Sequence, residues 1–172
     1  MQLSDIKDEE GFHGIPCEPK LLILDIDGTL IDSDDTKIYK RPGLAEFLQK
    51  CSKEFKLAIW SAAGPGHVEQ VVAECFTDIK LEFVWSGEKV CRKWNPVLNQ
   101  WDDIKPLKKV WRKKAWNRTN TLIVDDTPKT YCRNWGNAIG ISEWEQHMTT
   151  DRELKRVWTV LQTYRDKPVR TK

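Results

Sequence analysis

The 172-residue sequence contains no apolar run near the ~20 residues that a membrane-spanning helix requires. Its first residues, MQLSDIKDEEGFHG, are polar and acidic, which is not typical of a secretory signal peptide. The five cysteines form no C-x-x-C pair and do not cluster with histidine. An odd number of cysteines without metal-ligand spacing favours reduced, mostly buried thiols. We therefore expect a cytoplasmic or nuclear protein without a membrane partner.

An excess of charge is also lacking, because 28 basic residues nearly balance 26 acidic ones. A formal net charge of +2 gives no reason to expect a nucleic-acid partner. The basic run KKVWRKKAWNR (residues 108–118) has its apolar residues on one helical face, so its charged residues are expected to form a solvated face. No repeat or linker divides the chain. We expect an N-terminal arm at residues 1–19 and a single folded domain at residues 20–172.

Short apolar runs alternate with helical patterns along the chain. Short apolar runs predict buried strands at residues 21–24, 56–60 and 121–126, the last of which ends in two acids. Helical spacing predicts four helices, at residues 44–55, 67–76, 105–116 and 152–165. This alternation predicts an α/β fold, a doubly wound parallel sheet.

Three other segments have different patterns. Residues 31–40 are expected to form a polar loop, and residues 127–144 a short helix or loop followed by a small strand. Alternation around Ser86 and Gly87 predicts a small β-hairpin insertion within residues 81–101. No segment is long enough for a large cap domain.

Polar residues follow three of the predicted strands: Asp25 and Asp27, Ser61, and Asp125 with Asp126. Ligands of such sheets bind beyond the carboxyl ends of the strands, so these side chains are expected in one crevice. Four carboxylates repel one another unless a cation neutralises them, and hard oxygen ligands select Mg²⁺. A cation held by carboxylates is a common arrangement for handling phosphate.

Four segments carry a resemblance to a known family. DIDGTL at residues 25–30 resembles the Asp-x-Asp-x-Thr motif of haloacid dehalogenase phosphatases. RPGLAEFL (41–48), IWSAA (59–63) and VDDTP (124–128) resemble the small phosphatases that act on the C-terminal tail of RNA polymerase II, also called the NLI-interacting-factor-like group. The four segments occur in the family's order along most of the chain.

The resemblance implies a role for each of five residues. Asp25 would attack phosphorus and form an aspartyl-phosphate. Asp27 would protonate the leaving oxygen and then take a proton from the hydrolytic water. Lys105 would supply positive charge to the transferring group, although without the resemblance it is a solvated lysine before a proline. Thr29 would orient the loop, and Ser61 would donate a hydrogen bond to a phosphate oxygen.

The resemblance also implies a magnesium site. Its ligands would be Asp25, the backbone carbonyl of Asp27, and Asp126, with Asp125 in support. The sequence departs from the group at Gly28, where many members carry glutamate.

The missing cap favours a macromolecular substrate that itself excludes water, and a phosphoserine or phosphothreonine protein is the expected partner. Trp85, Trp94 and Trp101 in the predicted hairpin region either line a peptide groove or cover the edge of the sheet. His67 follows the IWSAA segment, where it would either contact substrate or, as expected, be a surface histidine in the first turn of a helix. Three alternatives stay open: a phosphatase for a small metabolite or nucleotide, a non-catalytic scaffold of the same fold, and a polynucleotide end phosphatase.

Overall fold

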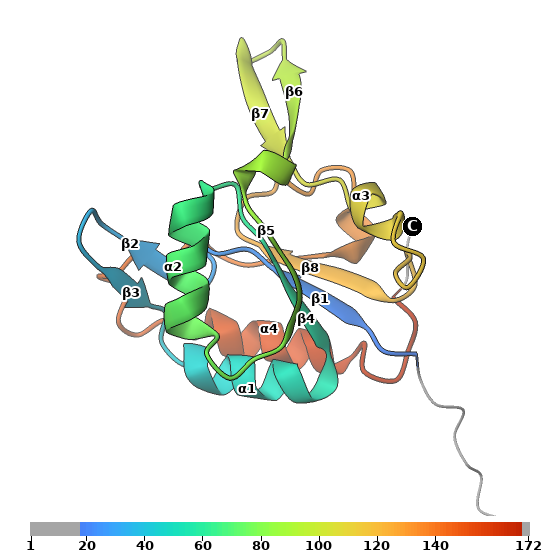
Figure 1. The fold of residues 1–172 in the computed structure, drawn as a ribbon, viewed down its shortest axis with the longest axis horizontal. Coiled ribbons are helices and arrows are strands. Elements are labelled where there is room, and N and C mark those ends of the chain that lie inside the picture. Colours follow the sequence, from blue (N-terminus) through green and yellow to red (C-terminus); the bar gives the residue numbers. More distant parts are fainter. Residues whose placement is uncertain (1–17, 170–172) are drawn as a thin grey trace, which may run out of the picture.

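The computed structural model describes residues 18–169, and its centre is a five-stranded parallel sheet (Figure 1). The strand order is β5-β4-β1-β8-β9, and each neighbouring pair is parallel. The strands are β1 (Leu21–Leu24), β4 (Lys56–Trp60), β5 (Leu81–Trp85), β8 (Thr121–Asp125) and β9 (Ala138–Gly140). This arrangement confirms the predicted α/β fold. Residues 1–17 of the predicted arm lie outside the described residues.

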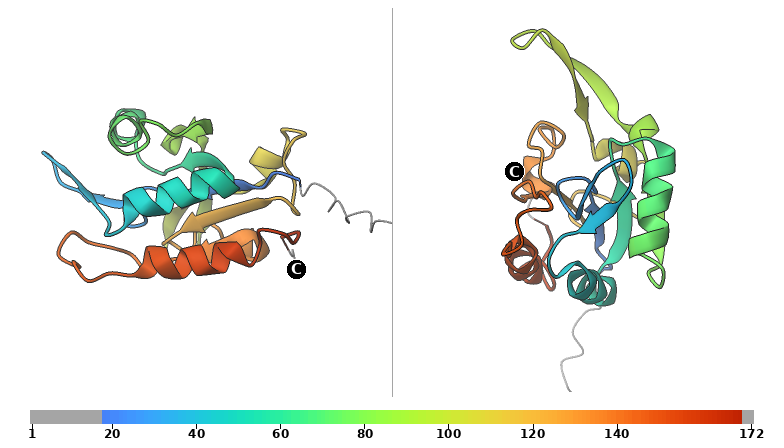
Figure 2. Two further views of the ribbon diagram at one scale, coloured as in Figure 1. Left: turned by 90° about the horizontal axis from the view of Figure 1, so that it is seen from below. Right: turned by 90° about the vertical axis from the view of Figure 1, so that its left-hand side faces the viewer.

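Helices cover both faces of the sheet. The helices are α1 (Leu44–Glu54), α2 (Pro65–Cys75), α3 (Lys108–Trp111) and α4 (Glu153–Gln162). α1 and α4 lie side by side along one face (Figures 1 and 2). The apolar residues of α1, α2 and α4 pack against Leu22 and Leu24, whereas α3 packs over Leu21 and Ile23. Because β1 is buried on both sides, its sequence is a continuous apolar run rather than an alternating one.

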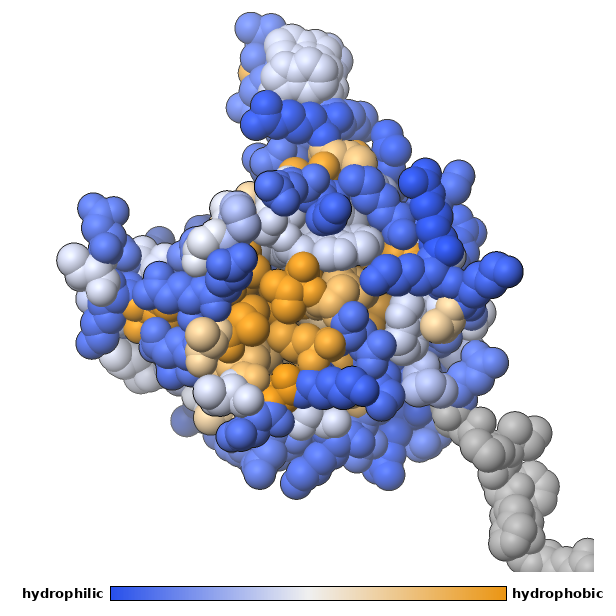
Figure 3. Space-filling view, in the orientation of Figure 1, coloured by the Kyte–Doolittle hydropathy of each residue, from blue (hydrophilic) through white to orange (hydrophobic). Residues whose placement is uncertain are grey.

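Apolar surface is not confined to the interior. On the face shown in Figure 3, apolar residues gather over β5 and the adjoining part of α2. Val84 of this edge strand is 41% exposed. Among residues 18–169, no helix is both long enough and apolar enough to cross a membrane.

The polar loop predicted at residues 31–40 is wrong, because these residues form a small antiparallel hairpin. Its strands are β2 (Ile31–Ser33) and β3 (Ile38–Lys40). The carboxylate of Asp34 accepts hydrogen bonds from the backbone amides of Thr36 and Lys37, at 2.9 Å each. A side chain that caps its own turn in this way lets a polar sequence form a hairpin.

The hairpin predicted at Ser86 and Gly87 is in the wrong place. Residues 81–85 are β5, and a short 3₁₀ helix, η1 (Gly87–Lys89), follows them. Gly87 serves close packing instead of a hairpin turn, since a Cβ there would lie 2.5 Å from the carbonyl oxygen of Ala62. The hairpin insertion is formed by β6 (Cys91–Asn95) and β7 (Gln100–Ile104), and it extends away from the body (Figures 1 and 2).

The chain after this hairpin is less helical than its sequence pattern predicts. The helix expected at residues 105–116 is confined to the four residues of α3. The small strand expected within residues 127–144 is β9, which follows a second 3₁₀ helix, η2 (Trp135–Asn137).

A buried arginine joins three segments that are distant in the sequence. Arg41 is 1% exposed, and its guanidinium donates to both carboxylate oxygens of Asp151 at 2.8 and 2.9 Å. It also donates to the carbonyl oxygens of Thr29 and Ser142, at 2.9 Å each. The guanidinium therefore ties the loop after β1 to the loop before α4.

We expect Arg41→Ala to lower the free energy of unfolding by about 3–5 kcal/mol, because it leaves the largely buried Asp151 carboxylate without its cation. The measurement is denaturant unfolding at neutral pH. The neighbouring Lys40→Ala is the matched control, since Lys40 and Glu74 form an exposed ion pair that contributes under about 1 kcal/mol. Equal losses in the two variants would contradict the prediction.

Candidate active site

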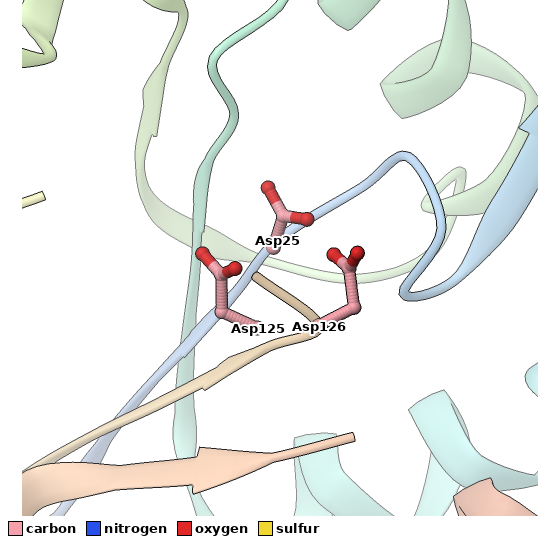
Figure 4. Close-up of side chains that lie close together, drawn as sticks. All are labelled: Asp25, Asp125 and Asp126. Carbon is pink, nitrogen blue, oxygen red and sulfur yellow. The ribbon is translucent and has the colours of Figure 1, made fainter. Parts of the chain in front are cut away.

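Three aspartates meet where β1 and β8 end. Asp25 follows β1, Asp125 is the last residue of β8, and Asp126 follows it. Their carboxylates point into one small region (Figure 4), with an oxygen of each within 4.8 Å of the others. Asp25 is 6% exposed and Asp125 is 1% exposed. Adjacent parallel strands carry their carboxyl ends to the same edge of the sheet, so the clustering follows from the β1–β8 pairing.

Lys105 places a positive charge inside this cluster. Its ammonium group donates to Asp25 Oδ1 and to Asp125 Oδ2, the latter at 2.7 Å, and the residue is 1% exposed. Burial acts to lower the pKa of Lys105, but attraction to the two carboxylates outweighs it and raises that pKa. The lysine therefore stays charged at neutral pH and is not the solvated lysine that its local sequence alone indicates.

The main chain around Lys105 holds the ammonium group in place. Lys105 directly follows β7, and its amide donates to the carbonyl oxygen of Thr130 at 2.6 Å. Its own carbonyl oxygen accepts a 2.7 Å hydrogen bond from the side chain of Asn134. The segment after β8 thus fixes the backbone from which Lys105 reaches the aspartates.

Burial disfavours the ionised forms of Asp25 and Asp125. Burial raises the pKa of Asp25, and Lys105 only partly counteracts it. Burial also raises the pKa of Asp125, to which the charge of Asp25 adds. A further cation beside these groups would relieve the repulsion and favour their ionised forms.

Thr29 links the nucleophile candidate to the end of β8. Its hydroxyl lies 3.0 Å from Asp25 Oδ2 and 3.0 Å from Asp126 Oδ1. The same oxygen accepts a hydrogen bond from the amide of Asp126 at 3.1 Å. The buried hydroxyl therefore connects the segment after β1 to the segment after β8.

Ser61 follows β4, the strand next to β1, and is 1% exposed. Its Oγ accepts a 2.9 Å hydrogen bond from the amide of Ala63, which leaves the hydroxyl proton available to a ligand.

Asp27 lies outside the cluster of three acids. Its carboxylate is 43% exposed, and its Oδ1 is 2.7 Å from Nε2 of His67. His67 lies in the first turn of α2, as expected, with 28% of its side chain exposed. Its contact with Asp27 follows from topology, because α2 comes directly after β4, the strand adjacent to β1.

The three tryptophans of the predicted groove occupy two different places. Trp94 and Trp101 face each other across the β6–β7 hairpin, with ring centroids 5.4 Å apart, and are 43% and 60% exposed. Trp85 lies on β5, against the rings of Trp60 and Phe83. The placement of Trp85 on the hairpin is wrong, since its strand joins the main sheet.

The donor set of the cluster fits Mg²⁺, because it consists of carboxylate oxygens. The oxygens of Asp125 are already engaged, one by Lys105 and the other by the amide of Thr127. Asp25 and Asp126 are likewise hydrogen-bonded at both oxygens, Asp25 by Lys105 and Thr29 and Asp126 by Thr29 and Thr127, so these contacts do not rank the three acids as ligands.

Comparison with solved structures identifies the fold class. The fission yeast RNA polymerase II CTD phosphatase Fcp1, in an R271A form bound to beryllium fluoride, aligns with a TM-score of 0.57 at 17% identity, over 86% of this chain and 51% of that one. A haloacid dehalogenase-superfamily hydrolase from Geobacter sulfurreducens aligns with a TM-score of 0.52 at 12% identity, over 71% of this chain and 89% of that one. At these identities the likeness establishes the fold, which is that of haloacid dehalogenase-like hydrolases.

The family follows from the sequence comparison. A family model described as NLI interacting factor-like phosphatase matches residues 20–169, and the chain belongs to that family. Ubiquitin-like domain-containing CTD phosphatase 1 of Xenopus tropicalis is 28% identical over 145 residues, and that of Homo sapiens is 27% identical over 145 residues. Each alignment covers 78% of this chain and 45% of the relative, so the chain spans about half the length of these curated relatives.

Gly28 offers a test of the cluster's packing. It has φ 71°, and a Cβ there would lie 3.0 Å from Asp126 Oδ2. Gly43 also has positive φ, at 80°, but a Cβ there would meet nothing within 4 Å. Both Gly28→Ala and Gly43→Ala should lose roughly 1–2 kcal/mol of stability from the left-handed backbone.

Only Gly28→Ala should also displace Asp126, and we expect it to weaken Mg²⁺ binding by about 10-fold or more. Isothermal titration calorimetry of each variant with MgCl₂ measures this difference. Equal Mg²⁺ affinity in the two variants would show that Gly28 is needed for its backbone alone.

Proposed function

We propose that this chain is a magnesium-dependent phosphatase that removes phosphate from phosphoserine or phosphothreonine in proteins. The observation that carries the proposal is the buried Lys105 ammonium between Asp25 and Asp125, with Asp126 beside them. A buried lysine held charged against a carboxylate suits a site that gathers negative charge during reaction. Membership of a phosphatase family supports the same reaction class.

Asp25 is the proposed nucleophile. One of its oxygens forms a bond to phosphorus while the ester P–O bond breaks, and Asp27 gives a proton to the leaving oxygen. Water then attacks the phosphorus of the aspartyl-phosphate and gives a proton to Asp27, so that phosphate leaves and both acids are restored. Lys105 and Thr29 fix the carboxylate of Asp25 for attack.

Mg²⁺, when bound, supplies positive charge against the phosphoryl oxygens. Asp25, Asp126 and the backbone carbonyl of Asp27 would hold the ion, while Asp125 keeps Lys105 in place. Ser61 would donate its hydroxyl proton to a phosphate oxygen.

The substrate class rests on the lack of a large cap among residues 18–169 and on the β6–β7 hairpin. Trp94 and Trp101 form an exposed aromatic pair on a projecting element, a surface that suits an extended peptide. The relatives named as CTD phosphatases support a protein substrate over a small metabolite. The four cysteines that the structure describes are free, which supports action in the cytoplasm or the nucleus.

The nucleophile is tested by Asp25→Asn. An amide does not attack phosphorus, so kcat on a phosphoserine peptide should fall on the order of 10³-fold or more. Asp35→Asn, an exposed aspartate in the turn between β2 and β3, is the matched control and should keep wild-type turnover. Excess EDTA should abolish wild-type turnover and MgCl₂ should restore it. Near-normal activity of Asp25→Asn would refute the mechanism, and turnover of sugar phosphates without any of phosphopeptides would refute the substrate class.

Peptide binding by the hairpin is tested with Trp94→Ala/Trp101→Ala. Loss of the aromatic pair should raise KM for a phosphopeptide by about 10-fold and affect p-nitrophenyl phosphate much less. Trp135→Ala removes a tryptophan that is 62% exposed but lies on η2, and it should change neither KM. Steady-state kinetics on the two substrates gives the comparison. Equal losses on both would mean that Trp94 and Trp101 only maintain the structure.

A further inference from the structure

His67 and Asp27 form a contact that the proposed reaction does not yet use. Nε2 of His67 lies 2.7 Å from Oδ1 of Asp27, although the residues are 40 apart in sequence. His67 is the third residue of α2, and the next residue, Val68, is 1% exposed in the core. Packing of Val68 and Val71 therefore fixes the helix, and with it the imidazole, relative to β1.

The acids of the site differ in how firmly they are held. Asp25 is bound by Lys105 and Thr29, whereas Asp126 is bound by Thr29 and Thr127. Within residues 18–169, His67 is the one side chain that hydrogen-bonds to the carboxylate of Asp27. The side chain of Asp27 is 43% exposed, whereas the side chains of Asp25 and Asp125 are 8% and 1% exposed.

We propose that His67 is the positioning residue of Asp27. This inference rests on the function proposed above. A carboxylate two residues from Asp25 would otherwise be free to turn toward a cation at the three-acid cluster, where it would become a ligand and be lost to proton transfer. The hydrogen bond to His67 keeps Asp27 outside that cluster.

The division of the two carboxylate oxygens follows from this geometry. Nε2 of His67 lies 2.7 Å from Oδ1 of Asp27. The proposed role assigns the ring proton to Nε2, which then donates to Oδ1, and leaves Oδ2 to carry the transferable proton. As the Asp25–phosphorus bond forms and the ester P–O bond breaks, that proton passes to the leaving oxygen. In the second step Oδ2 receives a proton from water. His67 gains and loses no proton in either step.

The effect of the leaving group on the rate of cleavage distinguishes positioning of Asp27 by His67 from a purely structural role of His67. A serine alkoxide is a poor leaving group that needs the proton from Asp27, whereas p-nitrophenolate departs unaided. In single-turnover experiments with Mg²⁺, His67→Ala should slow cleavage of a phosphoserine peptide by about 10²-fold, the lower end of what a general acid contributes. Its effect on p-nitrophenolate release should be at least ~10-fold smaller. His67→Gln places an amide donor near Nε2 and should recover most of the loss.

Two controls make the assignment specific. His147→Ala removes a histidine that also faces a carboxylate, Glu145 at 3.3 Å, but lies on the exposed loop before α4, and it should behave as wild type. In an Asp27→Asn background, His67→Ala should cause little further loss, because its effect acts through Asp27.

The outcomes are distinct. Equal losses of His67→Ala on both substrates, no rescue by His67→Gln, or additive losses in the Asp27→Asn background would each overturn the role of His67 and leave the phosphatase proposal intact. Absence of turnover by the wild-type protein on both substrates would overturn the proposed function, and this inference with it.

Discussion

The active site depends on one buried ion cluster, the ammonium of Lys105 between the carboxylates of Asp25 and Asp125. Taking three charged groups out of water costs several kcal/mol per ion unless each finds a partner of opposite sign. One lysine does not balance three acids, because Asp126 adds a further negative charge within 4.8 Å of the others. A cation bound beside these acids would balance the remaining negative charge.

The loop that carries the nucleophile candidate is held from two sides. On the side of the acid cluster, the hydroxyl of Thr29 contacts both Asp25 and Asp126. Behind the loop, Arg41 donates to the carbonyl oxygen of Thr29 while its other nitrogens bind Asp151 and Ser142. A loop fixed on both sides keeps its carboxylate oriented before substrate arrives, and such preorganisation is a large part of what a phosphoryl-transfer site contributes.

The sequence predicts those parts of this structure that local pattern determines. β1, β4 and β8 contain the apolar runs at residues 21–24, 57–60 and 122–124, so both the strands and the polar residues at their ends can be predicted from the sequence. Contacts that depend on the relative placement of distant elements are not readable. His67 reaches Asp27 only because α2 follows the strand adjacent to β1, and Trp85 leaves the hairpin only because β5 pairs with β4. The Ser-Gly pair that suggested a hairpin turn instead serves close packing at Ala62.

The β6–β7 hairpin carries the exposed aromatic pair, and its second strand leads directly to Lys105 at the acid cluster. Trp101 and Asp102 lie on β7, and Lys105 is the residue that directly follows this strand. Asp102 pairs with Lys93 in the middle of the hairpin, and its carboxylate accepts hydrogen bonds from the side chains of Asn95 and Gln100, the pair beside the turn, at 2.8 and 3.0 Å. A peptide seated against the aromatic pair would contact the same strand that positions the ammonium group beside the nucleophile. Under the function proposed above, a peptide held by Trp101 would lie four residues along the chain from Lys105.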